Sequence, residues 1–210
     1  MSCRENGKPR FVQVSTDEVY GSLRDINLSW TEDSPFNPRS PYSASKAAAE
    51  MLCWGYAETF GLDVVITRGS NTYGPRQYPE KLIPVAVGAA MQDKCVPVYA
   101  QGLNVRDWLW VGDHCRGILL AGMKGLCGQV YNIAGGHEVR NIDLVKRILS
   151  IMGKPESLIE FVKDRPAHDF RYSMRTDRAQ RELGWKPLAS FDERLEETVR
   201  WYEKGRQGRS

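Results

Sequence analysis

The sequence has little of what marks a secreted, membrane-bound or nucleic-acid-binding protein. Its five cysteines include no C-x-x-C pair and cannot all pair with one another, so we expect reduced thiols. No apolar run approaches membrane-spanning length, and the first ten residues lack the apolar core of a signal peptide. The net charge is only +3, from 29 basic and 26 acidic residues. We therefore expect a cytoplasmic protein that binds a small molecule, with no nucleic acid, membrane or metal as partner.

Internal repeats and low-complexity tracts are also missing, so solenoids and disordered proteins are excluded. With 210 residues, 41% of them hydrophobic, the chain can bury one sizeable core with a lobe attached.

The order of predicted elements indicates an α/β fold. Residues 11–15 and 62–70 have strand character, and the alanine-rich segment 40–61 between them predicts a long helix that stops at Gly61. A strand, helix and strand in this order imply a parallel sheet. Further predicted elements are a helix at the end of 106–123, a strand over 128–135 and an amphipathic helix over 141–153. Segments 73–84 and 162–175 have no clear period, which suits a substrate-facing lobe.

Two neighbouring carboxylates stand where the first strand should stop, in "STDEVYG" (residues 15–21). On a regular strand Asp17 and Glu18 would point to opposite faces, and two ionised carboxylates repel each other. An ordinary exposed turn is one interpretation. The other is that the chain bends at the carboxyl end of the strand, where α/β sheets place ligands, so that one group acts as an acid and the other as a base.

Tyr42 and Lys46 lie four residues apart at the start of the long helix, so both project from one face. An ammonium group near a phenol favours the phenolate, which would make the pair a proton-transfer device. An incidental surface contact is the alternative. The position of the helix directly after the Asp17–Glu18 strand favours the functional interpretation, since the two groups can converge.

"GMKGLCG" (residues 122–128) has the G-x-x-G-x-x-G spacing of some dinucleotide-binding loops, but it follows a predicted helix and precedes a predicted strand. A phosphate-binding loop has the reverse order, so a helix stop and a turn are expected here. Cations beside apolar or Gly-rich turns form a last set. They are Lys81, Arg106, Arg165 and, when protonated, His168. Each of these side chains alone is typical of a solvent-exposed surface, whereas together they could neutralise a diphosphate.

These motifs, in this order, resemble the NAD-dependent sugar-nucleotide epimerases and dehydratases of the extended short-chain dehydrogenase/reductase superfamily, specifically the dTDP-glucose 4,6-dehydratase family. The resemblance rests on "STDEVYG", "SPYSASKAAAE", "VVITRGSNTYGPRQYPEKLIP", "NVRDWLWVGDHCRGI", "VYNIAGG" and "DRPAHDFRY". The pair Asp17–Glu18 distinguishes this family from its relatives, since epimerases usually have Ser-Ala at these two positions, and decarboxylases and GDP-mannose dehydratases usually have Ser-Glu. An epimerase or decarboxylase, and a non-catalytic nucleotide-sugar binding protein, are the alternatives.

The resemblance implies a doubly wound Rossmann-like sheet, bound NAD and a dTDP-hexose substrate that is oxidised at C4, dehydrated across C5 and C6, and reduced at C6. Implied catalytic residues are Thr16, Asp17, Glu18, Tyr42 and Lys46. Implied NAD contacts are Ser15, Tyr42, Lys46 and Thr72. Implied substrate contacts are Asn71, Lys81, Leu82, Pro97, Tyr99, Arg106, Asn132, Arg165 and His168.

By the same resemblance, residues 1–75 would be the C-terminal part of the dinucleotide-binding domain. Residues 76–205 would be mostly a substrate-binding lobe with segments that return to the core, and 206–210 a tail. The Gly-rich phosphate loop of the family and one of the two helices of its homodimer would precede Met1. We therefore expect the 210 residues to be a truncated form, inactive and poorly suited to NAD binding or dimerisation.

Overall fold

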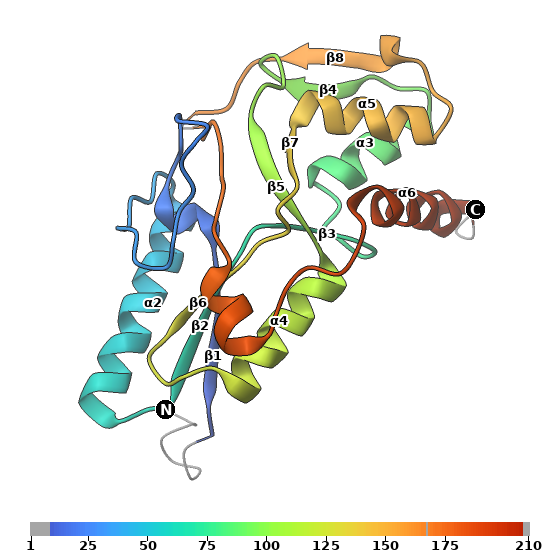
Figure 1. Cartoon of the computed structure of the whole chain (residues 1–210). Coiled ribbons are helices and arrows are strands. Elements are labelled where there is room, and N and C mark those ends of the chain that lie inside the picture. Colours follow the sequence, from blue (N-terminus) through green and yellow to red (C-terminus); the bar gives the residue numbers. More distant parts are fainter. Residues whose placement is uncertain (1–8, 167, 208–210) are drawn as a thin grey trace.

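A computed structural model describes residues 9–166 and 168–207 and confirms the α/β fold. Strands β1 (Phe11–Thr16), β2 (Val64–Gly69) and β6 (Val130–Ile133) form a parallel sheet in the order β1-β2-β6. Helix α2 (Pro41–Phe60) covers one face of this sheet and α4 (Val111–Lys124) the other (Figure 1). The expected strand–helix–strand unit is therefore present.

Local sequence accounts for the first crossover. The side chain of Ser40 accepts a hydrogen bond from the backbone N–H of Ser43, the side chain of Ser43 accepts one from the backbone N–H of Ser40, and Pro41 takes the first helical position of α2. Gly61 ends the helix in the left-handed conformation, with φ 63°. All six residues of β2 are buried, which explains its run of β-branched side chains.

A second group of strands lies beside the first sheet. Strands β3 (Asn71–Tyr73), β5 (Val105–Trp110) and β7 (Glu138–Arg140) pair in that order, and β4 (Val96–Tyr99) pairs with β8 (Ile159–Val162). Helices α3 (Leu82–Ala90), α5 (Asn141–Ile151) and α6 (Phe191–Gln207) pack around them in the upper part of Figure 1. The short helices are η1 (Asp17–Tyr20), η2 (Glu156–Leu158) and η3 (Ala179–Leu183).

Some expectations about local structure are corrected. The sequence motifs gave no indication of α3, α6 or β8. Helix α6 continues through Gln207, so the chain is helical two residues into the segment expected to be a tail. Residues 208–210 and Cys3 lie outside the described residues. The other four cysteines form no disulfide with one another.

A buried ion pair joins α2 to the sheet. The guanidinium of Arg68 on β2 donates to both carboxylate oxygens of Glu50, with the shortest distance 2.7 Å from Nη2, and both residues are at most 1% exposed. Arg68 also donates to the hydroxyl of Tyr20, at 2.6 Å. The hydroxyl of Tyr20 in turn donates to the side-chain oxygen of Asn132 on β6, at 2.8 Å. The network therefore connects α2, β2, η1 and β6.

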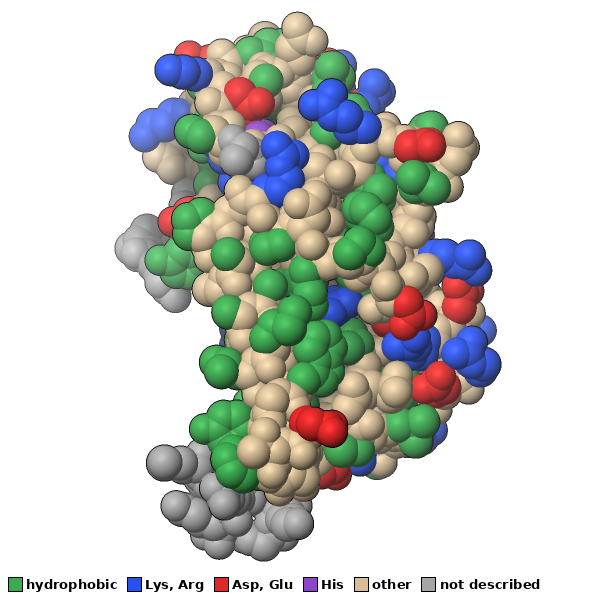
Figure 2. Space-filling view, turned by 90° about the vertical axis from the view of Figure 1, so that its left-hand side faces the viewer, with side chains coloured by type: hydrophobic (Ala, Val, Ile, Leu, Met, Phe, Trp, Pro, Cys, Tyr) green, Lys and Arg blue, Asp and Glu red, His purple; other side chains and the backbone are tan. Residues whose placement is uncertain are grey.

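The outer face of α2 is apolar. Figure 2 shows hydrophobic side chains gathered on the side of the molecule where this helix lies. The large exposed hydrophobic residues of its last three turns are Met51, Leu52, Tyr56 and Phe60. No helix among residues 9–166 and 168–207 is long and apolar enough to cross a membrane.

Candidate active site

The chain bends at the carboxyl end of β1, as the acid pair suggested. Thr16 is the last residue of the strand and caps the 3-10 helix η1, since its hydroxyl accepts from the backbone N–H of Glu18 at 3.3 Å. The same hydroxyl donates to Oδ1 of Asp17 at 3.1 Å. Asp17 is turned into the protein and is only 3% exposed, whereas Glu18 is half-buried.

Burial, helped by the charge of Glu18, raises the pKa of Asp17 to about 8. Within the described part of the chain, Oδ2 of Asp17 is buried without a hydrogen-bond partner. A carboxyl with this pKa is mostly protonated at pH 7 and can donate its proton to a leaving group.

Glu18 is the point where distant cations converge. Burial raises its pKa, while the positive charges of Arg106, Arg165 and Lys81 act in the opposite direction. These cations come from β5, from the loop after β8 and from the residue before α3. Three of the four basic residues singled out in the sequence therefore lie within electrostatic reach of one carboxylate.

Tyr42 lies near the acid pair. Partial burial and the charge of Glu18 raise its pKa, and a hydrogen bond with Thr16 opposes the shift. The ammonium of Lys46 donates instead to the backbone oxygen of Val14 on β1, at 2.6 Å. The ammonium is held by this backbone carbonyl while two carboxylates act on the phenol, so an effect of Lys46 on the pKa of Tyr42 stays a prediction.

The residues expected to hold NAD divide into two groups. Ser15 lies on β1 beside Thr16 and has a buried hydroxyl without a hydrogen-bond partner among the described residues. Ser15, Tyr42 and Lys46 therefore lie where they could contact a polar group of a ligand at the end of β1. The hydroxyl of Thr72 is engaged elsewhere, because it donates to the backbone oxygen of Ser70 and contacts Nδ1 of His114 at 2.7 Å. In this structure its hydrogen bonds are made within the protein.

Arg106 is more buried than a simple diphosphate ligand would be. It is 5% exposed, it donates to the backbone oxygens of Val105, Phe170 and Asp169, and its guanidinium lies 4.5 Å from the centre of the Tyr172 ring. Burial lowers its pKa. The structure therefore gives this arginine a role in joining β5 to the segment around residue 170, beside any role in binding an anion.

An aromatic cluster forms next to these cations. The ring of Tyr99, half-exposed at the end of β4, meets the ring of His168 edge-on at 6.2 Å. The guanidinium of Arg165 lies 5.6 Å from the centre of the Tyr99 ring. His168 contacts the carboxylate of Asp164 at 2.7 Å, and burial lowers its pKa. Pro97 lies two residues earlier on β4, and a cavity of about 560 Å³ opens beside His168.

The remaining predicted substrate contacts differ in their availability. Lys81 is exposed before the start of α3, and Leu82 begins that helix half-buried. Asn71 begins β3, and its side-chain oxygen is buried with no partner among the residues described. Asn132 is fully buried, its side-chain oxygen accepts from the hydroxyl of Tyr20, and its side-chain nitrogen donates to the backbone oxygen of Arg175. These bonds use one donor and one acceptor site of the amide, and its role as a substrate contact stays a prediction.

The glycine-spaced segment is a turn, as expected. Helix α4 ends at Lys124, and β6 begins at Val130. Gly125 packs so closely that an added Cβ would lie 2.5 Å from the backbone oxygen of Ala121, and Gly128 has φ 78°. These glycines serve a tight reversal between helix and strand.

Sequence reasoning overlooked two acids beside the site. Asp107 is 2% exposed, and burial raises its pKa to about 7 although the backbone N–H of His137 donates to it. Asp169 accepts from the hydroxyl of Tyr172 at 2.6 Å and from the guanidinium of Arg39 at 2.9 Å. Both acids occur in quoted motifs next to an apolar residue, which is the signal that could have indicated their burial.

Comparison with known proteins identifies the family to which the chain belongs. The family model described as GDP-mannose 4,6 dehydratase matches residues 1–198. A dTDP-glucose 4,6-dehydratase of Actinoplanes sp. is 50% identical over 197 residues, which are 94% of this chain and 61% of that protein. One of Haemophilus influenzae is 46% identical over 204 residues, which are 92% and 60% of the two chains. The chain therefore spans about three fifths of the length of these curated relatives.

Solved structures give the same picture. The dTDP-glucose 4,6-dehydratase DesIV of Streptomyces venezuelae, solved with NAD and TYD bound, superposes with a TM-score of 0.95 at 46% identity, over 98% of this chain and 63% of that one. The UDP-glucuronic acid 4-epimerase of Bacillus cereus superposes with a TM-score of 0.91 at 27% identity, over 97% and 64%. The fold is common to both enzymes, whereas sequence similarity favours the dehydratase.

Proposed function

The chain belongs to the GDP-mannose 4,6-dehydratase family, and from this premise we propose that it takes part in the reaction of a dTDP-glucose 4,6-dehydratase. The substrate would be a dTDP-hexose and the product its 4-keto-6-deoxy form. The observation that carries the proposal is the buried acid at the end of β1, mostly protonated at neutral pH, next to a second carboxylate and a tyrosine. An elimination of water needs one acid and one base at a single sugar.

NAD, when bound, would supply the redox chemistry by accepting two electrons from C4 of the sugar and returning them to C6. Ser15, Tyr42 and Lys46 are the residues whose placement fits this role. Lys46 would bind the cofactor by exchanging its bond to the carbonyl of Val14 for one to the ligand.

Tyr42 would remove the proton from the C4 hydroxyl during oxidation, while the hydroxyl of Thr16 donates to the C4 oxygen. Support comes from the contact between Tyr42 and Thr16 and from the half-exposed position of the phenol, which leaves one side open to a ligand. Because partial burial and, to a smaller extent, nearby carboxylates raise the pKa of Tyr42, the phenol is neutral before the reaction and needs a positive charge nearby to act as a base.

Glu18 and Asp17 would then divide the elimination between them. The C4 ketone makes the C5 proton acidic, Glu18 removes it, and the electron pair forms the C5–C6 double bond. The C6–O bond breaks, and Asp17 gives its proton to the departing hydroxyl, so that water leaves. When C6 is reduced, Glu18 would return a proton to C5. The raised pKa of Asp17 supports its assignment as the acid, and the greater exposure of Glu18 supports its assignment as the base.

The diphosphate and base would lie between the cations near Glu18 and the aromatic cluster at Tyr99. Lys81 and Arg165 are the exposed cations, and Tyr99 offers a ring face on which a base can stack. Anchoring these remote groups would hold the sugar in place through successive steps.

Self-association and cytoplasmic location are further parts of the proposal. The apolar outer face of α2 would be covered by a second copy of the chain, since isolated monomers rarely expose such a helix face, but this face alone is expected to hold a dimer only weakly. Sedimentation of the chain and of its Leu52→Glu variant over a range of concentrations tests this, with weak association expected that the variant loses. A chain that sediments as a monomer at all concentrations contradicts it.

The reaction itself is tested on these residues joined to the NAD-binding segment of a curated relative, because the 210 residues alone are expected to be inactive. The joined protein is incubated with NAD and dTDP-glucose, and mass spectrometry measures loss of one water from the nucleotide sugar. Asp17→Asn and Glu18→Gln should abolish this product, whereas Glu58→Gln, an exposed change on α2, should not. Substrate class is tested separately by calorimetric titration with dTDP and GDP. Equal affinity for the two nucleotides, or product formed by Asp17→Asn at the unchanged rate, contradicts the proposal.

A further inference from the structure

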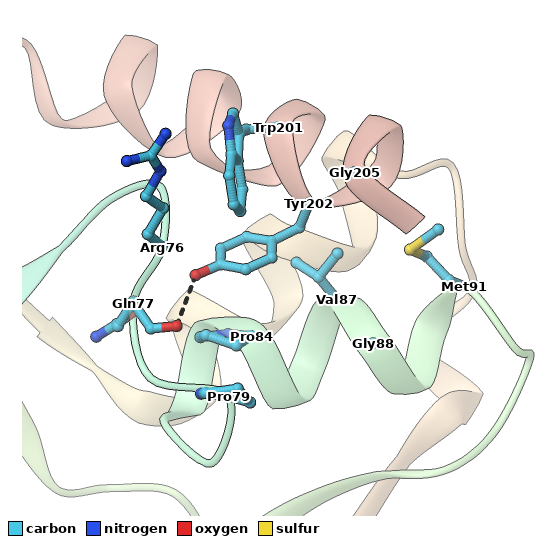
Figure 3. A pocket seen from close by; sticks show the side chains of 10 residues that line it. All are labelled: Arg76, Gln77, Pro79, Pro84, Val87, Gly88, Met91, Trp201, Tyr202 and Gly205. Carbon is cyan, nitrogen blue, oxygen red and sulfur yellow. Dashed lines mark hydrogen bonds between the residues drawn. The ribbon is translucent and has the colours of Figure 1, made fainter. Parts of the chain in front are cut away.

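A second cavity lies away from the acid pair, between α3, α6 and the loop that joins β3 to α3 (Figure 3). Its volume is about 470 Å³, within the range of small-molecule sites. None of the residues placed in the active site lines it. An inference about this cavity therefore goes beyond the proposed reaction and does not rest on it.

The walls of the cavity are apolar and flat. The wall residues that matter here are Pro79, Pro84, Val87, Met91, Trp201 and Tyr202. Figure 3 shows the indole of Trp201 hanging from α6 toward α3 and the ring of Tyr202 lying across the middle of the space. Two aromatic rings facing prolines and aliphatic side chains suit a flat apolar ligand.

The floor of the cavity is fixed before any ligand arrives. The hydroxyl of Tyr202 donates to the backbone oxygen of Gln77 at 3.0 Å, and the side-chain amide of Gln77 donates to the backbone oxygen of Thr72 at 2.9 Å. These bonds hold the ring and the loop together. A rigid aromatic wall reduces the ordering cost of binding.

One charged side chain borders this apolar space. In Figure 3 the guanidinium of Arg76 rises from the loop toward α6, alongside Trp201. Among residues 9–166 and 168–207 it has no hydrogen-bond or ion-pair partner. Arg76 also has φ 65°, a conformation that is costly for a residue with a side chain and that concentrates at functional positions.

We propose that this cavity binds a small molecule that combines a flat apolar body with one anionic group, the body packing against the rings of Trp201 and Tyr202 and the anion meeting Arg76. Charge complementarity decides the class of ligand. An apolar cavity with one unpaired arginine selects an aromatic carboxylate or a similar anion over a neutral molecule of the same shape.

The test uses indole-3-acetate and its neutral counterpart indole-3-acetamide as probes, with the chain labelled at its methionine methyl groups. Met91 lines the cavity, and its NMR signal is identified by its disappearance in Met91→Leu. We expect saturable shifts of this signal, with about tenfold tighter binding of the carboxylate because a charged group strengthens the hydrogen bond. The signal of Met174, buried in a different core cluster, reports whether each variant is folded.

Three variants separate the proposal from non-specific binding. Arg76→Gln should bring the affinity ratio of the two probes close to one, whereas Arg200→Gln, which removes an exposed arginine of α6 already paired with Glu203, should leave the ratio unchanged. Trp201→Leu should weaken the binding of both probes. No shift of the Met91 signal with indole-3-acetate, or an unchanged ratio in Arg76→Gln, overturns the proposal.

Discussion

Replacing Asp17 by asparagine should stabilise the folded chain, and increasingly so as the pH rises. Asp17 has a pKa of about 8 when folded against 3.8 as the ordinary value, chiefly because of burial. Between these values the folded state holds a proton that the unfolded state has lost. Since stability falls with pH wherever the folded state binds more protons, Asp17 destabilises the fold progressively from about pH 4 to pH 8.

The size of the effect follows from the same two values. Each pH unit in this window costs about 1.4 kcal/mol of unfolding free energy, so the three units from pH 5 to pH 8 amount to about 4 kcal/mol. Asparagine has nearly the same shape and does not titrate, so Asp17→Asn loses this dependence. Glu18 and Asp107 also have raised pKa values, and because both are present in both proteins, only their interaction with the charge of Asp17 remains in the difference.

Urea unfolding of both proteins at pH 5 and pH 8 measures the difference. A stability difference between them that is the same at both pH values would refute the burial argument, whatever its absolute size. Asp113→Asn is the control, because the pKa of Asp113 is lowered in the folded state, whereas that of Asp17 is raised. Burial raises the pKa of Asp113, but bonds from Arg116 and from the backbone of Ala189 and Leu188 outweigh this and lower it. That carboxylate therefore stabilises the fold at neutral pH and loses its effect as the pH falls toward its folded pKa, so the variant should be less stable at pH 8.

Three further predictions concern the ion pair, the tyrosine and the cofactor. Glu50→Gln should cost about 3–5 kcal/mol of unfolding free energy in urea, because it leaves Arg68 buried without its partner, whereas Glu58→Gln should cost little. In these residues joined to the NAD-binding segment of a curated relative, Tyr42→Phe should slow oxidation at C4 by about 10²–10⁴-fold, and rapid NADH formation followed by absorbance would contradict its role as base. The 210 residues alone should bind NAD with an affinity on the order of millimolar or weaker in calorimetry, because their one glycine-spaced segment is a turn between α4 and β6. Tight binding would refute this.

The parts of the fold that could be predicted have strong local signals. The helix over residues 41–60 has a capping serine, a first-turn proline and a terminal glycine, and β2 is a run of buried β-branched residues. The bend after β1 was predictable because an adjacent acid pair fits neither face of a strand. Helix α3 was missed because it is apolar nearly all round and contains Pro84, so it has no clear period. Strand β8 has no buried residue and lacks a strand signal of its own.

The states of the site residues depend on contacts between distant segments, which no local pattern contains. The hydroxyl of Thr72 forms a hydrogen bond with His114, which lies 42 residues later. The ammonium of Lys46 donates to a backbone carbonyl of β1, 32 residues earlier. Arg106 is held by backbone oxygens more than 60 residues away. A motif gives the residue types that a site needs, whereas tertiary packing decides which polar atoms remain available to a ligand.

Asn132 shows how the framework of the fold positions the catalytic turn. It resembled a substrate contact in sequence, yet it ends a chain of bonds that runs from Glu50 through Arg68 to Tyr20. Tyr20 is the last residue of η1, the turn that begins with Asp17. The ion pair between α2 and β2 therefore fixes the helix that carries Tyr42 and the turn that carries the acid pair against the same sheet. Loss of Glu50 should consequently disturb the burial of Asp17 as well as the stability of the fold, and the pH dependence assigned to Asp17 should weaken in Glu50→Gln, where Asp17 itself is unchanged.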